Sequence, residues 1–363
     1  MTQAVALAQQ ASTGVSQGFK NRIINGAMVI DQRNAGASVT GNDNVYGVDR
    51  FRVQVSQSSK FTMQQNAGSV TPPAGFTNYL GITSSSAYSV TSSDYFFLQQ
   101  RIEGYNVADL DFGKSTAKTI TISFWVRSSL TGTFGGVLGN SAFDRSYPYT
   151  YTINAANTWE YKTITIAGDT TGTWVGATNG LGLRVRFGLG VGSDFSGTAG
   201  AWAGAGYSSA TGATSVVGTN GATFYITGVQ LEVGSTATSF DYRPYGTELA
   251  LCQRYYYRLS LASDGDRYCV GFNQSTTSAE GVLFFKNSMR IAPTALEQTG
   301  TASNYSIINQ TTNVSCSAVP AFSKSSTDTA TVTFTVASGL TAGNGSMFRS
   351  NASNTYLAWS AEL

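Results

Sequence analysis

The 363-residue sequence predicts a mostly β protein built from two β-sandwich domains that are joined by a short buried α-helix. Stretches of alternating apolar and polar residues recur on both sides of the chain's middle, with turn residues roughly every 8–12 positions. Charged residues make up only 12% of the chain, about half the usual share, while Gly contributes 40 residues and Tyr and Phe contribute 19 and 20. One stretch alone has the apolar spacing of a convincing helix. These observations favour strands over most of the chain.

The expected helix spans residues 244–259, where Pro244 and Gly246 precede a run of apolar residues. Thr247 can cap its first turn, and Glu248 places a negative charge there. Apolar side chains lie on almost every side of this helix, which predicts burial against more than one surface. Either the two domains cover it, or copies of the chain meet around it. We expect oligomer contacts at Leu249, Leu251, Cys252, Tyr255 and Tyr256.

The first domain is expected to span residues 19–243 and to begin with a strand at Met28–Gln32. Its clearest strands are Thr119–Arg127 and Leu181–Leu189, in which apolar residues alternate with polar ones. In its last strand the apolar positions change phase at Thr227–Gly228. This change predicts a β-bulge in which glycine supplies the backbone freedom. The Gly-, Ser- and Thr-rich connection before that strand is too long for an ordinary loop.

The second domain is expected to span residues 260–363 and to form a smaller sandwich. Thr329–Val336 alternates most cleanly, with apolar residues between threonines. The final residues of the chain are expected to end this domain as a strand rather than as a loose tail. The remaining expected strands are Arg267–Phe272, Gly281–Lys286, Tyr305–Asn309 and Thr355–Ala361.

The composition excludes several classes of function. The chain has no His, which removes Ser-His-Asp and Cys-His catalysis and His-ligated metals. Lys and Arg number 22 against 20 Asp and Glu, which favours neither nucleic acid nor an anionic membrane as a partner. No stretch is apolar for long enough to insert into a membrane as a helix. Asp109 and Asp111 form a carboxylate pair of the kind that glycosidases use, but two acids this close in sequence more often belong to a turn.

The cysteines and the N-terminus bear on where the chain folds. Cys252, Cys269 and Cys316 are scattered thiols, and an odd, sparse set does not suit a disulfide framework. Folding in a reducing compartment is therefore expected. The opening MTQAVALAQQA lacks the basic and apolar regions of an export signal. Residues 1–18 are expected to be either a disordered tail or a segment that anchors the chain by ordering on a partner.

Two long motifs and the chain's ending suggest a family. NRIINGAMVIDQRNAG at Asn21–Gly36, FYITGVQLEVGSTATSFDYRPYGTELALCQRYYYRL at Phe224–Leu259 and the closing WSAEL together resemble phage and prophage virion proteins of the tail-fibre or head-fibre type. Asn25-Gly26 and Phe224–Glu232 also resemble the first and last strands of carbohydrate-binding-module jelly rolls. The resemblance implies jelly-roll-like domains in a non-enzymatic fibre or decoration protein, of a kind that is commonly trimeric.

Aromatic residues in loops are the strongest candidates for ligand binding. Exposed Trp and Tyr rings stack on sugars, although core packing is the ordinary role of an aromatic residue. The resemblance to carbohydrate-binding jelly rolls also implies a structural calcium ion near the first and last strands, and no other cofactor is expected. The candidate glycan-binding residues are Tyr147, Tyr149, Trp174, Trp202 and Tyr207, and the candidate calcium ligands are Asn25, Glu232 and Asp241.

The residues and the resemblance together favour a phage tail-fibre subunit that forms a homotrimer and adsorbs to the host through a surface glycan. Its N-terminal segment would bind other virion proteins, and the chain would act without enzymatic activity. Alternatives are a capsid decoration or head fibre without a receptor role, a virion-associated glycan depolymerase, and a free carbohydrate-binding module. The expected location is the virion, with synthesis in the host cytoplasm and release by lysis.

Overall fold

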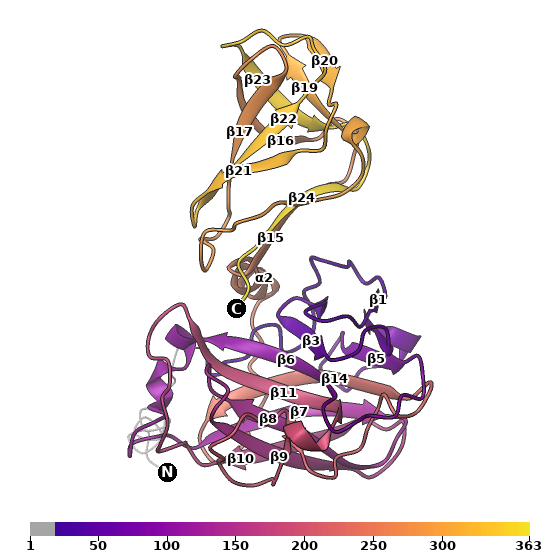
Figure 1. Cartoon of the computed structure of the whole chain (residues 1–363), viewed down its shortest axis with the longest axis vertical. Coiled ribbons are helices and arrows are strands. Elements are labelled where there is room, and N and C mark those ends of the chain that lie inside the picture. The colour runs from indigo at the N-terminus through magenta and orange to yellow at the C-terminus, as the bar shows by residue number, and fades with distance from the viewer. Residues whose placement is uncertain (1–18) are drawn as a thin grey trace, which may run out of the picture. The chain divides into compact units, whose positions relative to one another are not determined.

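The computed structural model describes residues 19–363 (Figure 1). Its contacts divide the chain into two compact units, each described by itself below. Unit 1 contains the described chain up to Val29, Gly36–Gly47 and Phe51–Tyr245, and unit 2 contains Ile30–Ala35, Val48–Arg50 and Gly246–Leu363. Two short pieces from the N-terminal part of the chain therefore belong to the C-terminal unit. The expected anchor at residues 1–18 lies outside the described residues.

Unit 1 is a jelly-roll-like β-sandwich of two antiparallel sheets. Sheet A has the strand order β1-β4-β5-β14-β7-β10, and sheet B has the order β2-β3-β6-β11-β8-β9. The strands of sheet A are β1 (Val39–Thr40), β4 (Phe61–Gln65), β5 (Leu80–Ser84), β14 (Thr223–Val233), β7 (Ile120–Ser128) and β10 (Glu160–Ile166). Those of sheet B are β2 (Tyr46–Val48), β3 (Phe51–Val55), β6 (Tyr95–Glu103), β11 (Leu181–Val191), β8 (Gly132–Gly139) and β9 (Ser146–Ile153).

The two sheets pack face to face through the apolar residues that alternate along their strands. The ring of Phe124 on β7 lies 5.1 Å from that of Phe187 on β11, measured between centroids. Phe134 on β8 lies 6.2 Å from Phe224 on β14 in the same way. Both pairs join sheet A to sheet B across the core. The strands predicted from alternation at residues 119–127 and 181–189 are confirmed as β7 and β11.

The predicted β-bulge in β14 is confirmed. The pairing of β14 with β7 shifts register between Thr227 and Gln230, and Gly228 has a φ of 61°. Gly26 lies against this bulge, because the amide of Val229 donates a hydrogen bond to the Gly26 carbonyl oxygen at 2.9 Å. A Cβ atom on Gly26 would lie 2.1 Å from the Val229 carbonyl oxygen. Two of the family-like motifs therefore meet here, and the close approach of their backbones requires glycine.

The strand expected at Met28–Gln32 does not form, so that prediction was wrong. Asn25 and Met28 have φ values of 61° and 58°, which take the backbone out of the extended region that a strand ladder needs. Met28 and Ile30 are nevertheless buried. The apolar pattern therefore indicated burial correctly, but burial here does not require a strand.

The long connection between β11 and β14 is ordered by short elements of its own. Strands β12 (Ser196–Gly197) and β13 (Ser209–Ala210) pair in parallel. The ring of Tyr207 covers Gly197, where a Cβ atom would lie 2.3 Å from a ring carbon. The 3-10 helices of the described chain are η1 (Ala67–Ser69), η2 (Gly104–Asn106), η3 (Ala108–Leu110), η4 (Ser193–Phe195) and η5 (Ala302–Asn304).

Unit 2 is a smaller β-sandwich. Its larger sheet has the order β20-β19-β23-β16-β17-β22-β21 and its smaller sheet the order β15-β24-β18. Each of the five strands expected in this region overlaps an observed one, and Phe334 stacks on Phe348 in the core at 4.4 Å between centroids. The strands are β15 (Tyr256–Leu261), β16 (Arg267–Asn273), β17 (Ser278–Phe284), β18 (Glu297–Gln298), β19 (Tyr305–Asn309), β20 (Thr312–Ser315), β21 (Ala321–Ser325), β22 (Thr329–Thr335), β23 (Gly345–Ser350) and β24 (Thr355–Ser360).

The helix expected at residues 244–259 is shorter than predicted. Helix α2 spans Tyr245–Gln253, and strand β15 begins at Tyr256. This strand pairs with β24 from Tyr256 opposite Ser360 to Leu261 opposite Thr355. Tyr and Leu suit a half-buried strand as well as a helix, and the pairing with the C-terminal strand decides between them. Within residues 19–363, no helix is long and apolar enough to cross a membrane.

Candidate functional site

Three of the five predicted glycan-binding residues meet in one aromatic cluster. Trp202 lies 5.5 Å from Trp174 and 5.4 Å from Tyr147, measured between ring centroids. Phe112, which the sequence did not single out, lies 4.8 Å from Trp174 and 5.7 Å from Trp202. All four contacts are edge to face, which is a favoured geometry for packed rings. With the two Trp residues and Tyr147 half-buried, the cluster is chiefly a packing unit.

An ion pair between half-buried Arg145 and buried Asp169 lies against this cluster. Asp169 accepts hydrogen bonds from the Arg145 guanidinium at 2.6 and 2.8 Å, and Nε1 of Trp174 lies 3.3 Å from the same carboxylate. Nε1 of Trp202 donates to the Ala167 carbonyl oxygen at 2.7 Å. Burial acts to raise the pKa of Asp169, but hydrogen bonds from Arg145 and Thr171 outweigh it and lower that pKa. The Trp174 ring is therefore held by the Asp169 carboxylate and the Trp202 ring by a backbone carbonyl oxygen.

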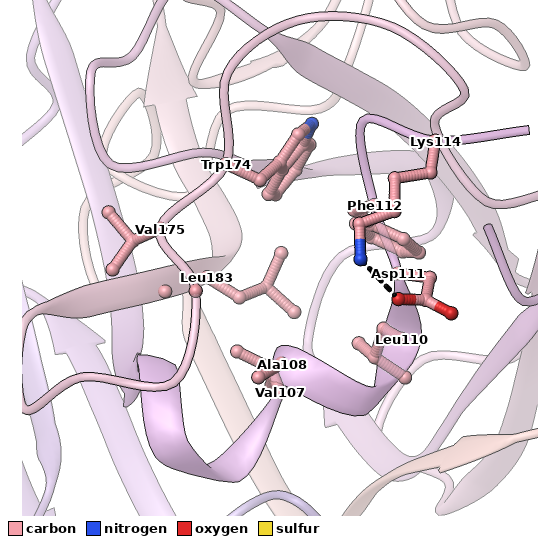
Figure 2. A pocket seen from close by; sticks show the side chains of 11 residues that line it. Val107, Ala108, Leu110, Asp111, Phe112, Lys114, Trp174, Val175 and Leu183 are labelled. Atoms are coloured by element: carbon pink, nitrogen blue, oxygen red, sulfur yellow. Dashed lines mark hydrogen bonds and ion pairs between the residues drawn. The ribbon is translucent and has the colours of Figure 1, made fainter. Parts of the chain in front are cut away.

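A small pocket lies beside the cluster, and Figure 2 shows its lining. Val107, Leu110 and Leu183 form its apolar wall, and the rings of Phe112 and Trp174 complete it. The pocket has a volume of about 80 Å³. Ligand pockets in proteins usually have volumes of about 300 Å³ or more. This pocket is therefore too small to enclose a sugar ring.

The carboxylate pair considered for catalysis lies close to this pocket. Asp111 lies at the rim, where Nζ of Lys114 donates to its carboxylate at 2.8 Å (Figure 2). Asp109 pairs with Arg22 at 2.7 Å and lies 3.9 Å from Nζ of Lys118. The hydrogen bond and charge of Lys114 lower the pKa of Asp111. A glycosidase general acid needs a raised pKa, and Asp111 has a lowered one, so Asp111 is not poised as such an acid.

The other two predicted ring residues lie elsewhere. Tyr149 is only 1% exposed, and its hydroxyl donates to the Arg186 carbonyl oxygen at 2.7 Å. Tyr149 is thus a core residue, and its assignment as a ligand-stacking ring was wrong because the inward phase of β9 carries it into the sandwich. Tyr207 is half-buried over Gly197 and makes no ring contact with the cluster among the described residues.

A larger groove, here called the sheet A groove, lies on the outward face of sheet A and has a volume of about 390 Å³. Trp125 on β7 is directly opposite Tyr161 on β10, with ring centroids 5.3 Å apart. None of its lining residues in the described chain is charged. The lining residues are Phe76, Ser123, Trp125, Tyr161, Gly228, Ala237, Thr238, Ser239, Phe240 and Tyr242.

The outward face of sheet B has a second groove, here called the arginine groove, of about 310 Å³. The strand register places Gln54 of β3 beside Phe97 of β6, and Gln99 of β6 beside Arg186 of β11. Rings and polar side chains therefore alternate across three neighbouring strands. The lining residues are Gln54, Tyr95, Phe97, Phe143, Arg184, Arg186, Phe195 and Ser208.

Arg186 lies at the base of the arginine groove and is only 2% exposed. Its guanidinium lies 4.0 Å from the centroid of the Phe143 ring and 4.2 Å from that of Phe97. Nη1 of Arg186 donates to the Ser208 hydroxyl at 2.9 Å. Stacking between two rings suits the flat guanidinium and leaves its edge for hydrogen bonds.

No residue of the arginine groove was among the predicted binding residues. A signal was present in β6, where Tyr95, Phe97, Gln99 and Arg101 occupy the positions between core residues. Large rings at outward positions of a strand are a sign of a second packed or binding surface. Phe143 and Phe195 gave no such signal, because each lies in a connecting segment whose position only the tertiary structure defines.

The predicted oligomer contacts are largely covered within unit 2. Tyr255 and Tyr256 are 0% and 2% exposed, and the guanidinium groups of Arg50 and Arg33 lie over their rings at 3.5 and 3.7 Å. Cys252 is also fully buried. These three residues serve the fold of unit 2, so their assignment to contacts between copies was wrong. Leu249 and Leu251 are half-buried and keep part of their surface accessible.

The three candidate calcium ligands are engaged in other interactions. The Glu232 carboxylate accepts a hydrogen bond from the Gln230 side chain at 2.8 Å, and the Asp241 carboxylate accepts one from the Asn21 amide at 3.1 Å. Asn25 is fully buried. No group of three or more His, Cys, Asp or Glu side chains in residues 19–363 is placed to hold a metal ion. The calcium site remains a prediction.

No protein-family model and no curated protein sequence matches the chain. Similar solved structures include the enzymatically active domain of bacteriophage CBA120 tailspike protein 4, with a TM-score of 0.31, 11% identity and coverage of 54% of this chain but 22% of that one. A CBM4 structure has a TM-score of 0.29 and 18% identity, with coverage of 58% and 98%. The family 11 carbohydrate-binding module from Clostridium thermocellum has a TM-score of 0.29 and 13% identity, with coverage of 56% and 98%. Likenesses this loose identify neither a ligand nor its binding residues.

Proposed function

We propose that the protein is a subunit of a phage virion appendage that binds a host surface glycan without cleaving it. The motif resemblance supports the virion location, and the arginine groove is the observation that carries the binding function. It places aromatic rings beside hydrogen-bond donors on an open sheet face. A sugar offers an apolar face to such rings and hydroxyl groups to such donors. The groove volume of about 310 Å³ lies within the usual range for ligand sites.

Binding to host cells tests this proposal. Fluorescently labelled protein should bind the cells, and polysaccharide purified from the cell surface should displace it. Phe195 packs on Tyr95 with ring centroids 5.4 Å apart, so Phe195→Ala should weaken binding about tenfold by removing one ring of the groove. Tyr105→Ala is the matched control, since Tyr105 is 59% exposed and does not line the groove.

The outcomes separate the rival functions. Absence of wild-type binding to host cells would contradict adsorption and favour a decoration or head-fibre role. Release of reducing sugar from the purified polysaccharide would contradict the non-enzymatic assignment and favour a depolymerase. Equal loss of binding in both variants would show that the groove is not the binding site.

Copies of the chain, we further propose, associate through the outer face of the larger sheet of unit 2. Five apolar side chains lie exposed there on β16, β17 and β23, and Val270 is directly opposite Met347 in register. The five side chains themselves carry no charge, while the cationic residues Arg267 and Lys286 line one surface pocket together with Val270, Val282 and Phe284. Exposed apolar rows of this kind mark interaction surfaces. They are Val270 at 68%, Phe272 at 51%, Val282 at 44%, Phe284 at 75% and Met347 at 39% exposure.

Light scattering after size exclusion tests this association. The wild-type protein should run as an oligomer, with the homotrimer as the expected state, and the double variant Val270→Ser, Phe284→Ser should run as a monomer. Ile291→Ser is the control, because Ile291 is 39% exposed but lies outside these strands. A monomeric wild type would contradict self-association and leave another virion protein as the partner of this face.

A further inference from the structure

Positive charge is concentrated on the outward face of sheet B. Arg184 on β11 lies directly opposite Arg101 on β6. Arg186 and Arg52 lie on either side of Gln99, from β11 and β3. Like charges placed directly opposite each other destabilise a sheet. This face therefore carries a charge arrangement that packing alone would disfavour.

The neighbouring acids leave most of this charge uncompensated. Glu103 lies two residues beyond Arg101 on the same face and is buried, while Asp94 precedes the same strand and accepts hydrogen bonds from three neighbouring residues. Among the described residues, no carboxylate lies within ion-pair distance of the other three arginines. Burial, and then the charge of Arg184, lowers the pKa of Arg186.

Two guanidinium groups keep donors for a ligand. Arg184 donates through Nη2 to the Ser141 carbonyl oxygen at 2.8 Å. Arg186 uses Nη1 for Ser208 and directs Nε toward Gln99 at 3.4 Å. Nη1 of Arg184 and Nη2 of Arg186 have no hydrogen-bond partner within residues 19–363. Arg184 is only half-buried, so its free donor is the more accessible of the two.

We propose that the arginine groove binds a carboxylate-bearing sugar residue of an acidic glycan, an inference that rests on the proposed glycan-binding function. A guanidinium and a carboxylate share a flat geometry that suits paired hydrogen bonds. The carboxylate supplies the negative charge that the face lacks, with Arg184 as its main contact and Arg186 contributing from below. The apolar face of the same sugar packs on the rings of Tyr95 and Phe195.

The test uses labelled full-length protein bound to host cells, with the host's purified surface polysaccharide as competitor. One portion of the polysaccharide is left native, and in the other the carboxyl groups are reduced to alcohols. The native form should compete about tenfold better than the reduced form, and Arg184→Gln should abolish this difference. Arg267→Gln, at an exposed arginine of β16 in unit 2, is the matched control and should keep the difference.

The outcomes distinguish this inference from the function on which it rests. Equal competition by the two polysaccharides overturns the acidic preference while glycan binding stands. Failure of the wild-type protein to bind any host cell overturns the proposed function itself. Inorganic sulfate is tested as a competitor at the same concentration of anionic groups. If it competes as strongly as the native polysaccharide, the groove recognises an anion alone, and the proposal that it binds a sugar is overturned. A normal melting temperature for Arg184→Gln excludes misfolding as the reason for its loss.

Discussion

The two grooves of unit 1 have similar volumes, about 390 Å³ on sheet A and about 310 Å³ on sheet B, but opposite chemical character. The sheet A groove is lined by rings and hydroxyls without a charged side chain, whereas the other has two arginines among its rings. Each groove lies on the outward face of one sheet of the same sandwich. The fold therefore supplies the platform twice, and the side chains of the outward strand positions and of the adjoining segments give each groove its chemical character.

The floors of the two grooves differ as well. Gly228 lines the sheet A groove and creates the bulge of β14, so part of that groove depends on a special backbone conformation. In the arginine groove the pairing of β11 with β6 shifts register between Gly188 and Gly190, but it is regular where the two arginines lie, with Arg186 directly opposite Gln99. We therefore expect the first groove to be sensitive to backbone substitution and the second to be sensitive to charge.

The largest expected effect comes from Gly228→Val. Gly228 has a φ of 61°, and a Cβ atom there would lie 2.6 Å from the ring of Phe76. Strain and overpacking together should lower the free energy of unfolding by about 2–5 kcal/mol, measured by chemical denaturation. Gly176→Val is the control, because a Cβ atom at Gly176 would meet nothing within 4 Å. Equal stability of the two variants would show that the bulge does not need glycine.

Acid should destabilise the support of the arginine groove. Burial acts to raise the pKa of Asp94, but hydrogen bonds from Thr91, Ser56 and Tyr88 outweigh it and lower that pKa to about 2. A folded-state pKa below the unfolded value stabilises the fold at higher pH, and this stabilisation is lost as the pH falls from about 4 through about 2. The melting temperature of the wild type should therefore fall over this range. The melting temperature of Asp94→Asn should be lower than that of the wild type at neutral pH and should change less with pH. Melting temperatures that fall in parallel for the two proteins would contradict the role of Asp94.

Removing one groove arginine should stabilise the unliganded protein. Burial, and then the charge of Arg52, lowers the pKa of Arg184, and Nε of Arg184 is buried without a hydrogen-bond partner among the described residues. Arg184→Met keeps much of the packing and removes the repulsion, which should raise the free energy of unfolding by about 1 kcal/mol. Thermal and chemical denaturation without glycan measure this difference. A less stable variant would show that Arg184 serves the fold rather than a ligand.

The alternation of apolar and polar residues predicted most of the strands of this fold. Its limits also explain which elements and binding residues were not predicted. Strands such as β7 and β22 were predicted because the apolar residues of each strand face the core of its own unit, and the phase change at Gly228 marked the bulge. The end of helix α2 was not predicted, because the residues around Tyr256 suit a strand equally well once β24 pairs with them. Binding residues were predicted among aromatic residues in loops. This choice identified Trp174 and Trp202, which do contact each other, but it missed the aromatic residues at outward positions of the strands.

The smallest expected effect comes from Tyr161→Ala in the sheet A groove. Tyr161 is 43% exposed, and its main ring contact is the cross-strand pair with Trp125. Such a pair is worth about 0.2–1 kcal/mol, so the free energy of unfolding should fall by no more than this amount. Tyr161 does not line the arginine groove. Competition by the native polysaccharide for binding of the variant should therefore stay within about twofold of that for the wild type. Loss of that competition would show that the ligand uses the neutral face of the sandwich, and the contrast between the two grooves would then have been assigned the wrong way round.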